Sequence, residues 1–159
     1  MRKTIIAVAL SSLVICGYSQ GKKETAKASK VNVPEVVTKA FTNQFPKATK
    51  VKWSIEKPGE YEAEFNTNLS EMSAVYSDKG DLLETEAEIK RSELPQAVQM
   101  ALTKDFSGYK LDEFEKTKVK DVVTYEMEAR KGKVQYELVF DGNGKLLKKE
   151  QKTNGQAND

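Results

Sequence analysis

Two short runs of this chain carry a glutamate at every second position: Glu60, Glu62 and Glu64, and later Glu126 and Glu128. Paired carboxyl groups can act as general acid and general base when their surroundings separate their pKa values. Both runs alternate with apolar residues, so a period of two places the carboxyl groups together on one face of a strand. We expect that face to be solvated, with nothing to shift the pKa values. The pattern therefore favours a charged surface over a catalytic pair.

Other chemistries that particular residue types would reveal are missing from the sequence. The chain contains no histidine, the commonest general base and metal ligand, and its single cysteine, Cys16, cannot form an intramolecular disulfide. The serines have no base to activate them, and no phosphate loop, nucleophile elbow or metal-ligand cluster occurs. We therefore predict that the protein is not an enzyme and has no catalytic residue, cofactor or metal site.

One turn offers oxygen atoms of the kind that calcium prefers. The sequence Asp141-Gly142-Asn143-Gly144 stands between two apolar runs. A calcium loop needs a longer series of oxygen ligands that ends in a bidentate glutamate, and that series is missing here. Asn-Gly between alternating strands is instead the strongest short hairpin signal, so we interpret the segment as a plain hairpin turn.

The composition is that of a folded but polar protein. Of the 159 residues, 38% are hydrophobic and 31% are charged, which allows one domain of ordinary size or two small modules. The formal charge of +2 comes from Arg2 and Lys3, because without residues 1–19 the Lys+Arg count falls from 26 to 24 and equals the Asp+Glu count of 24. A neutral chain argues against a nucleic-acid partner, since such binding needs a positive excess.

Residues 1–19 have the pattern of an export signal. Two basic residues precede an apolar run, Thr4 to Ile15, which is too short to span a bilayer. Two processing routes are open. Cleavage after Ser19 would release a periplasmic or secreted protein, whereas lipidation of Cys16 would make it a lipoprotein. The lysine-rich residues 20–31 show no apolar period, and we expect a flexible tether there.

Folded structure is predicted to begin near Asn32. Pro34 suits the first turn of a helix, apolar residues then recur at helical spacing, and Pro46 ends the helix. Alternating runs separated by Pro-Gly and Asp-Lys-Gly turns follow. Residues 32–91 are therefore predicted to form one helix and about four antiparallel strands.

The same order of elements recurs in residues 92–150. A constant offset relates the pairs Pro34/Pro95, Phe45/Phe106 and Trp53/Phe114. A second constant offset, larger by three, relates Tyr61/Tyr125, Gly80/Gly144 and Leu82/Leu146. We infer an internal duplication with a three-residue length change in the first hairpin loop. The first strand of the second copy does not alternate cleanly, and a bulge near Phe114 would reconcile it with the first copy.

The fold class is α+β, with two tandem repeats, each a helix followed by a roughly four-stranded antiparallel meander. A helix cannot bury its apolar stripe alone, so each one should cover the apolar face of its own meander. This places Phe41, Phe45, Met100, Leu102 and Phe106 opposite Trp53, Phe65, Tyr136, Leu138 and Phe140. The predicted segments are a signal peptide (1–19), a tether (20–31), two repeats (32–91 and 92–150) and a flexible tail (151–159).

These motifs resemble those of the PepSY-like family. They are Val33-Pro34-Glu35-Val36-Val37, Phe45-Pro46, Val51-Lys52-Trp53, Tyr61 to Phe65 and Asp78 to Leu82, echoed at Leu94-Pro95, Phe106, Phe114, Tyr125 and Asn143-Gly144. The family is also described as β-lactamase-inhibitor-like and is common among exported proteins of Bacteroidetes-type bacteria. The resemblance covers residues 32–150 and implies one curved sheet with both helices on one side.

The resemblance implies a periplasmic binding protein that inhibits or modulates another envelope protein. The candidate protein-binding face consists of outward-pointing strand residues: Glu60, Glu62, Glu64, Glu126, Glu128, Arg130 and Glu137. A protein or peptide partner on such a face predicts salt-sensitive association. A small cationic or peptide ligand bound between the repeats, and a structural envelope role, are the alternatives. We expect no membrane span, and free edge strands leave the oligomeric state open.

Overall fold

A computed structural model describes residues 31–152 of the chain. Its elements are α1 (Glu35–Gln44), β1 (Thr49–Lys57), β2 (Glu60–Asn66), β3 (Glu71–Ser77), β4 (Leu82–Glu88), the 3-10 turn η1 (Arg91–Glu93), α2 (Gln96–Asp105), β5 (Lys110–Val119), β6 (Val122–Lys131), β7 (Val134–Asp141) and β8 (Leu146–Lys152). The predicted signal peptide, the lipidation candidate Cys16 and residues 20–30 of the predicted tether lie outside the described residues. So do residues 153–159, whereas β8 takes in the first two residues of the predicted tail.

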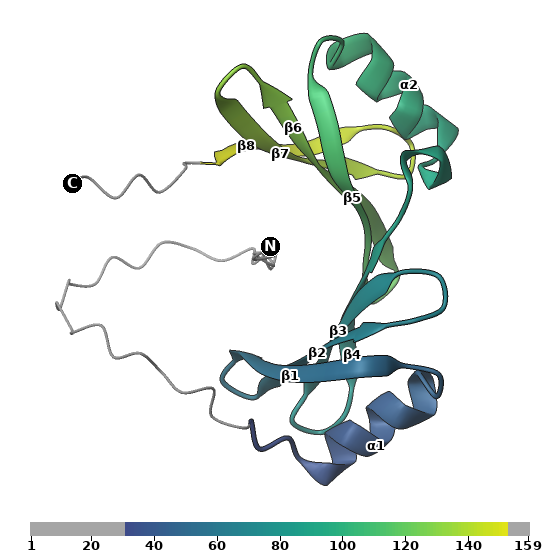
Figure 1. Cartoon of the computed structure of the whole chain (residues 1–159), viewed down its shortest axis with the longest axis vertical. Helices are drawn as coiled ribbons and strands as arrows, with labels where there is room; N and C mark the ends of the chain where they lie inside the picture. Colours follow the sequence, from purple (N-terminus) through teal and green to yellow (C-terminus); the bar gives the residue numbers. More distant parts are fainter. Residues whose placement is uncertain (1–30, 153–159) are drawn as a thin grey trace, which may run out of the picture. The chain divides into compact units, whose positions relative to one another are not determined.

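All eight strands form one antiparallel sheet in the order of the sequence, from β1 at one edge to β8 at the other (Figure 1). The two repeats share this sheet because β4 pairs directly with β5, from Glu84 opposite Val119 to Glu88 opposite Glu115. The prediction of two helix-plus-four-strand repeats in a single antiparallel sheet is confirmed.

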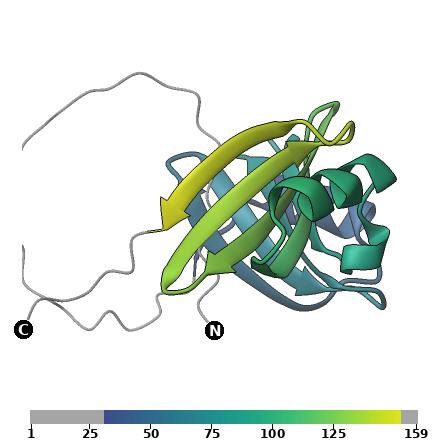
Figure 2. The ribbon, with the colours of Figure 1, turned by 90° about the horizontal axis from the view of Figure 1, so that it is seen from above.

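Both helices cover the same face of the sheet (Figures 1 and 2). The strand register shows that this face is continuous from the first repeat to the second. Directly paired residues on it run from Met72 on β3 to Phe140 on β7, through Ala87, Lys116 and Tyr125. Met72 packs against the core beneath α1, and Phe140 belongs to the core beneath α2. The opposite face carries no helix within the described residues, and we call it the helix-free face.

A proline and an aromatic residue bound each helix. Pro34 and Pro95 are the N-cap residues, and their carbonyl oxygens accept hydrogen bonds from the first turns. At the other ends the backbone N–H groups of Phe45 and Phe106 donate to carbonyl oxygens four residues earlier. The fixed φ of proline is suited to a helix start, which explains why the sequence placed both helices correctly.

Each repeat has its own hydrophobic core between its helix and its strands. The buried residues are Val37, Phe41, Ala63, Phe65, Ala74 and Tyr76 in the first repeat, and Leu94, Val98, Leu102, Phe106, Met127, Ala129, Leu138 and Phe140 in the second. Trp53, Tyr61, Phe114 and Tyr125 pack against these cores, as predicted. The expectation for Met100 is wrong, because it is 65% exposed. It stands two residues from both Val98 and Leu102, which turns it to the opposite side of α2.

The irregularity predicted near Phe114 is a β-bulge. The register between β5 and β6 shifts between Asp112 and Glu115, and Glu113 has a φ of 52°. Beyond the bulge, Lys116 lies opposite Tyr125. β1, the first strand of the first repeat, has an irregularity of the same kind between Thr49 and Lys52, where Lys50 has a φ of 54°.

The hairpin turns before β4 and β8 are in close contact with the helices. Gly144 has a φ of 81°, and a Cβ atom there would lie 2.5 Å from the carbonyl oxygen of Ala97 in α2. The backbone N–H groups of Asn143 and Lys145 both donate to Asp141 Oδ1, at 2.9 and 3.0 Å. Asp141 therefore organises this turn with its carboxylate, which supports the hairpin interpretation over a calcium loop.

Candidate functional site: the helix-free face of the sheet

The helix-free face brings together polar side chains from every strand of the sheet. Across the sheet, Glu62 lies opposite Val75, and Val75 opposite Glu84; farther along, Glu126 lies opposite Val139, and Val139 opposite Lys148. The seven predicted binding residues, Glu60, Glu62, Glu64, Glu126, Glu128, Arg130 and Glu137, all alternate onto this face. It also carries Ser54, Ser73, Glu84, Glu86, Glu88, Glu115, Thr117, Lys148, Glu150 and Lys152.

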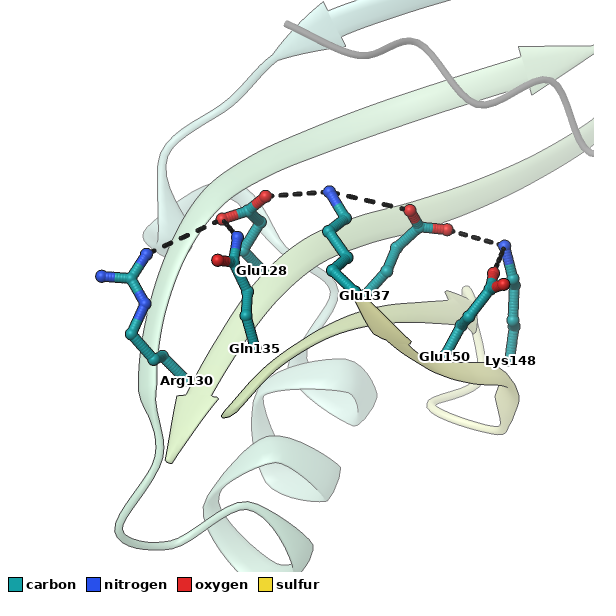
Figure 3. A network of polar contacts seen from close by, with 7 residues as sticks. Glu128, Arg130, Gln135, Glu137, Lys148 and Glu150 are labelled. Carbon is teal, nitrogen blue, oxygen red and sulfur yellow. Dashed lines mark hydrogen bonds and ion pairs between the residues drawn. The ribbon is translucent and has the colours of Figure 1, made fainter. Parts of the chain in front are cut away.

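Towards the β8 edge, the acidic side chains of this face are paired with lysines of the same chain (Figure 3). Lys148 Nζ lies 2.8 Å from Glu137 Oε1 and 2.7 Å from Glu150 Oε2. Lys152 Nζ lies 2.8 Å from Glu128 Oε1 and 3.8 Å from Glu137 Oε2. Each ammonium group therefore lies between two carboxylates, and we call this set the β8 lysine network.

Two further side chains complete the network at Glu128. The Gln135 amide donates a hydrogen bond to Glu128 Oε2, and Arg130 lies 4.0 Å from the same oxygen (Figure 3). Burial alone would lower the pKa of Lys152, but its hydrogen bond to Glu128 and the neighbouring carboxylates outweigh burial and raise the pKa. Hydrogen bonds to Glu137 and Glu150 raise the pKa of Lys148. The neighbouring carboxylates thus favour the charged form of both lysines.

The middle of the helix-free face is different. Glu62 on β2, Glu84 and Glu86 on β4 and Glu126 on β6 form what we call the central glutamate cluster. Glu62 is 5% and Glu86 9% exposed. Among the described residues, no lysine or arginine side chain forms an ion pair with any of these four carboxyl groups.

Burial and mutual repulsion hold protons on this cluster. Burial, reinforced by the charge of Glu115 and the other cluster members, raises the pKa of Glu86 to about 8. Burial also raises the pKa of Glu126 to about 7. The pKa values of Glu62 and Glu84 are raised for the same first reason, burial. Part of the cluster is therefore uncharged near pH 7, because like charges in a partly desolvated site disfavour ionisation.

These pKa values correct the expectation that the strand glutamates are solvated and unperturbed. For Glu62 and Glu126 that expectation is wrong. Alternation along one strand correctly assigns the face, but burial depends on the side chains of neighbouring strands. In this sheet Glu84 and Glu86 on β4, Glu115 on β5 and Glu137 on β7 bring further carboxyl groups to the same surface.

Hydroxyl groups satisfy only part of the cluster's hydrogen-bonding capacity. Ser54 Oγ donates to Glu62 Oε2 at 3.0 Å, and Ser73 Oγ donates to Glu86 Oε2 at 3.4 Å. The other oxygen of Glu62, Oε1, is buried and accepts no hydrogen bond from the part of the chain that the structure describes. A buried acceptor without a donor is costly, so this oxygen is a favourable contact point for an added N–H donor.

Glu84 and Glu86 were not among the predicted site residues. The signal for them was present in the sequence: Glu84, Glu86 and Glu88 alternate along β4 in the same way as the acidic residues of β2. What the sequence does not show is that β4 pairs with β5. That pairing places the β4 glutamates in the centre of the sheet rather than at an edge.

The duplication gives the cluster a direct internal comparison. Val75 pairs with Glu84 in the first repeat, and Val139 pairs with Lys148 in the second. These positions follow the larger of the two constant offsets in the sequence, so Glu84 corresponds to Lys148, and Glu88 corresponds to Lys152. The first repeat therefore carries glutamates at the two positions where the second repeat carries its network lysines.

Other sites can be assessed for the described residues. Residues 31–152 contain no group of acidic or cysteine side chains close enough together to hold a metal ion. Within the same range, no helix has the length and apolar character that crossing a membrane would need.

Comparison with known proteins agrees with the fold. A solved structure from Bacteroides eggerthii, described as a "putative periplasmic" protein, has a TM-score of 0.73 at 19% identity and covers 80% of this chain and 94% of its own. A "BLIP-like protein" from Bacteroides fragilis has a TM-score of 0.69 at 22% identity and covers 81% of this chain and 93% of its own. No curated protein gives a significant match.

The model of one protein family matches the chain twice, over residues 21–84 and 59–148. That family is described as "Putative beta-lactamase-inhibitor-like, PepSY-like". Two matches are what a duplicated unit produces, and together they span most of the chain. With its two helix-plus-four-strand repeats, the chain belongs to the PepSY-like family.

Proposed function

We propose that this protein is a non-enzymatic, exported binding protein that holds another exported protein on the helix-free face of its sheet and thereby inhibits or modulates it. The main observation behind this proposal is the central glutamate cluster, whose carboxyl groups have no cationic partner among the described residues. Membership of a family described as β-lactamase-inhibitor-like supports a protein partner. A solved relative described as periplasmic supports the location.

A catalytic role for the cluster is less well supported. A general acid with a raised pKa needs a cleft that holds substrate and excludes water. One pocket of the described residues lies beside α2, with Gln99, Met100 and Thr103 in its wall. The raised pKa values are those of crowded carboxyl groups on a sheet surface.

The test is capture from an envelope extract of the host, followed by binding of the purified candidate. The bait is the chain from residue 20 onward, used at low and at high salt. We expect one partner to be retained at low salt and released at high salt, and to be lost with Glu126→Lys. Asp105→Lys is the matched control, since it changes the charge equally at an exposed position on α2. Equal retention by both variants would argue against the helix-free face.

A small cationic ligand is the second candidate, and the same unpaired carboxyl groups favour it. Such a ligand would stabilise the folded protein to a degree that increases with its free concentration. Spermidine should then raise the melting temperature of the wild-type protein, and an extract should yield no protein partner. A partner captured from the extract without any shift by spermidine would favour the first candidate.

Export is part of the proposal and has its own test. The two routes, cleavage after Ser19 and lipidation of Cys16, differ in whether the product carries acyl chains. A lipidated protein would partition into a detergent phase, and Cys16→Ser would return it to the aqueous phase. A protein that stays aqueous in both forms would indicate cleavage after Ser19.

A further inference from the structure

The β8 lysine network shows how this sheet accommodates an ammonium group. Lys148 and Lys152 extend from an edge strand, and each ammonium group lies between two carboxylates. Glu137 is 6% exposed and both lysines contact it, at 2.8 and 3.8 Å. A buried carboxylate on this face is therefore accommodated when a lysine is supplied.

The first repeat keeps only part of this arrangement. By the same offset along the sequence, Glu64 and Glu86 correspond to the network carboxylates Glu128 and Glu150, whereas Ser73 stands in the place of Glu137. Glu84 and Glu88 stand in the places of the two lysines. Glu62 has no ion pair within the described residues, and its Oε1 atom is buried there without a hydrogen-bond donor. A lysine or arginine side chain would supply both the missing ion pair and the missing hydrogen-bond donor.

The distribution of side chains leaves defined positions for such donors. On this face Val75 on β3 separates Glu62 from Glu84, and Ser73 on β3 and Thr117 on β5 lie on either side of Glu86. The β5 residue opposite Glu126 is itself acidic, Glu115. Cluster strands are two strand spacings apart, which is roughly 9–10 Å. An ammonium or guanidinium group above Val75 would lie between Glu62 and Glu84. One above β5 would lie between Glu86 and, diagonally across the strand, Glu126.

We propose that the central glutamate cluster receives two or more lysine or arginine side chains of a protein partner, inserted above β3 and β5, in the role that Lys148 and Lys152 have in the second repeat. This inference rests on the proposed function and adds the chemistry of the partner to it. The partner presents a basic segment with cationic side chains roughly 10 Å apart, the spacing of the two positions. Both repeats contribute to the site, because β4 and β6 lie on either side of the junction.

Binding of this kind is coupled to protons. Within residues 31–152, the charged groups that face the cluster are Glu56 on β1, Glu60 and Glu64 on β2, Glu88 on β4, Glu115 on β5, Glu137 on β7 and the more distant cations Lys57 and Lys148. Except for the two lysines, all are acidic, so an added cation lowers the pKa values of Glu86 and Glu126. Binding therefore releases protons near neutral pH, and affinity rises as the pH increases from about 6 to about 8.5.

The experiment uses tetralysine as the probe and calorimetry in two buffers that differ in ionisation enthalpy. The wild-type protein should bind tetralysine with proton release. Glu84→Lys places a lysine at the position that matches Lys148 and should weaken binding about tenfold at low salt. The control Asp105→Lys should bind as the wild type does. Glu86→Gln removes one titrating group of the cluster without adding a positive charge. This variant should release fewer protons than the wild-type protein when it binds tetralysine.

Several outcomes would overturn the inference. Equal affinities for Glu84→Lys and Asp105→Lys would show that tetralysine responds to net charge and not to the cluster. Spermidine binding as tightly as tetralysine, with the same loss in Glu84→Lys, would make the cluster a polyamine site. If Glu84→Lys does not fold, unchanged proton release by Glu86→Gln refutes the inference independently. A partner that is captured equally by wild type and Glu84→Lys would refute this inference and leave the proposed function standing.

Discussion

The two faces of the sheet have diverged differently since the duplication. On the helix side, matched positions stay apolar and buried: Val37/Val98, Phe41/Leu102, Ala63/Met127, Phe65/Ala129, Ala74/Leu138 and Tyr76/Phe140. On the helix-free face, the matched positions Glu84 and Lys148 carry opposite charges. A core position must fill space against its helix, whereas a face position needs only a compatible neighbour. The helix-free face could therefore change its charge more readily. In the second repeat its carboxylates are paired with lysines of the same chain, whereas in the first repeat it is acidic.

The two cores also differ in where they place large and small side chains. Where the first repeat has Ala63 and Ala74, the second has Met127 and Leu138. In the opposite direction, Phe65 corresponds to Ala129. Cores tolerate such changes when the total volume is conserved and the pattern is kept. The first repeat accordingly packs more rings together, and Phe41 contacts several of them.

The largest expected effect is a cavity in one of these cores. Phe140 is 1% exposed and packs edge-on against Phe106, with ring centroids 6.0 Å apart. Phe140→Ala should lower the free energy of unfolding by about 3–5 kcal/mol, measured by urea denaturation. Val122→Ala, at a position that is 64% exposed, is the control and should change it by less than about 0.5 kcal/mol. If Phe140→Ala had the same urea midpoint as the wild-type protein, the packing of β7 against α2 would be refuted.

A second prediction concerns the pH dependence of stability. Glu86 and Glu126 have folded pKa values of about 8 and about 7, against an ordinary value of 4.5. Between these limits the folded state holds more protons than the unfolded state, so stability is greatest near pH 4.5 and falls as the pH rises to about 8. The decrease should be a few kcal/mol in order of magnitude.

Urea midpoints at about pH 5.5 and about pH 8.5 measure this decrease. Glu86→Gln should reduce the difference between the two midpoints, because it removes the group with the larger of the two shifts. Lys148 does not obscure the test, since its raised pKa affects stability above its ordinary value of 10.5. Midpoints that rise between the two pH values would contradict the raised pKa values.

The two helix-contacting turns give a smaller and graded effect. Gly144→Ala would bring a Cβ to 2.5 Å from Ala97 O, and Gly80→Ala would bring one to 3.1 Å from Val36 O. We expect a loss of about 2–3 kcal/mol for Gly144→Ala and about 1–2 kcal/mol for Gly80→Ala, from strain and steric contact together. A Cβ at Gly132 would have nothing within 4 Å, so the loss of stability in Gly132→Ala measures the cost of the positive φ without any steric contact. Equal losses at Gly144 and Gly132 would show that the turn does not press on α2.

Local patterns were sufficient to predict the repeats. Pro34 and Pro95 marked the helix starts, the matched offsets located the duplication, and the failure of alternation near Phe114 located the bulge. The site was predicted only in part. Glu126 was assigned to the correct face, but the clustering of Glu86 with it depends on the pairing of β4 with β5 across the intervening α2. Such pairing joins residues distant in sequence, and no periodicity encodes it.

The smallest predicted effect tests the charge difference between the repeats most directly. Glu84→Lys should raise the free energy of unfolding by about 1 kcal/mol at neutral pH, because it places an ammonium group among the cluster carboxylates. Lys148→Met should lower it by a similar amount, because Glu137 loses the nearer of its two lysine partners, at 2.8 Å. Both effects should shrink at high salt, although less than for fully exposed pairs. If Glu84→Lys destabilises the protein as much as Lys148→Met does, the electrostatic environments of β4 and β8 are not equivalent, and the first repeat does not accommodate an ammonium group as the second repeat does.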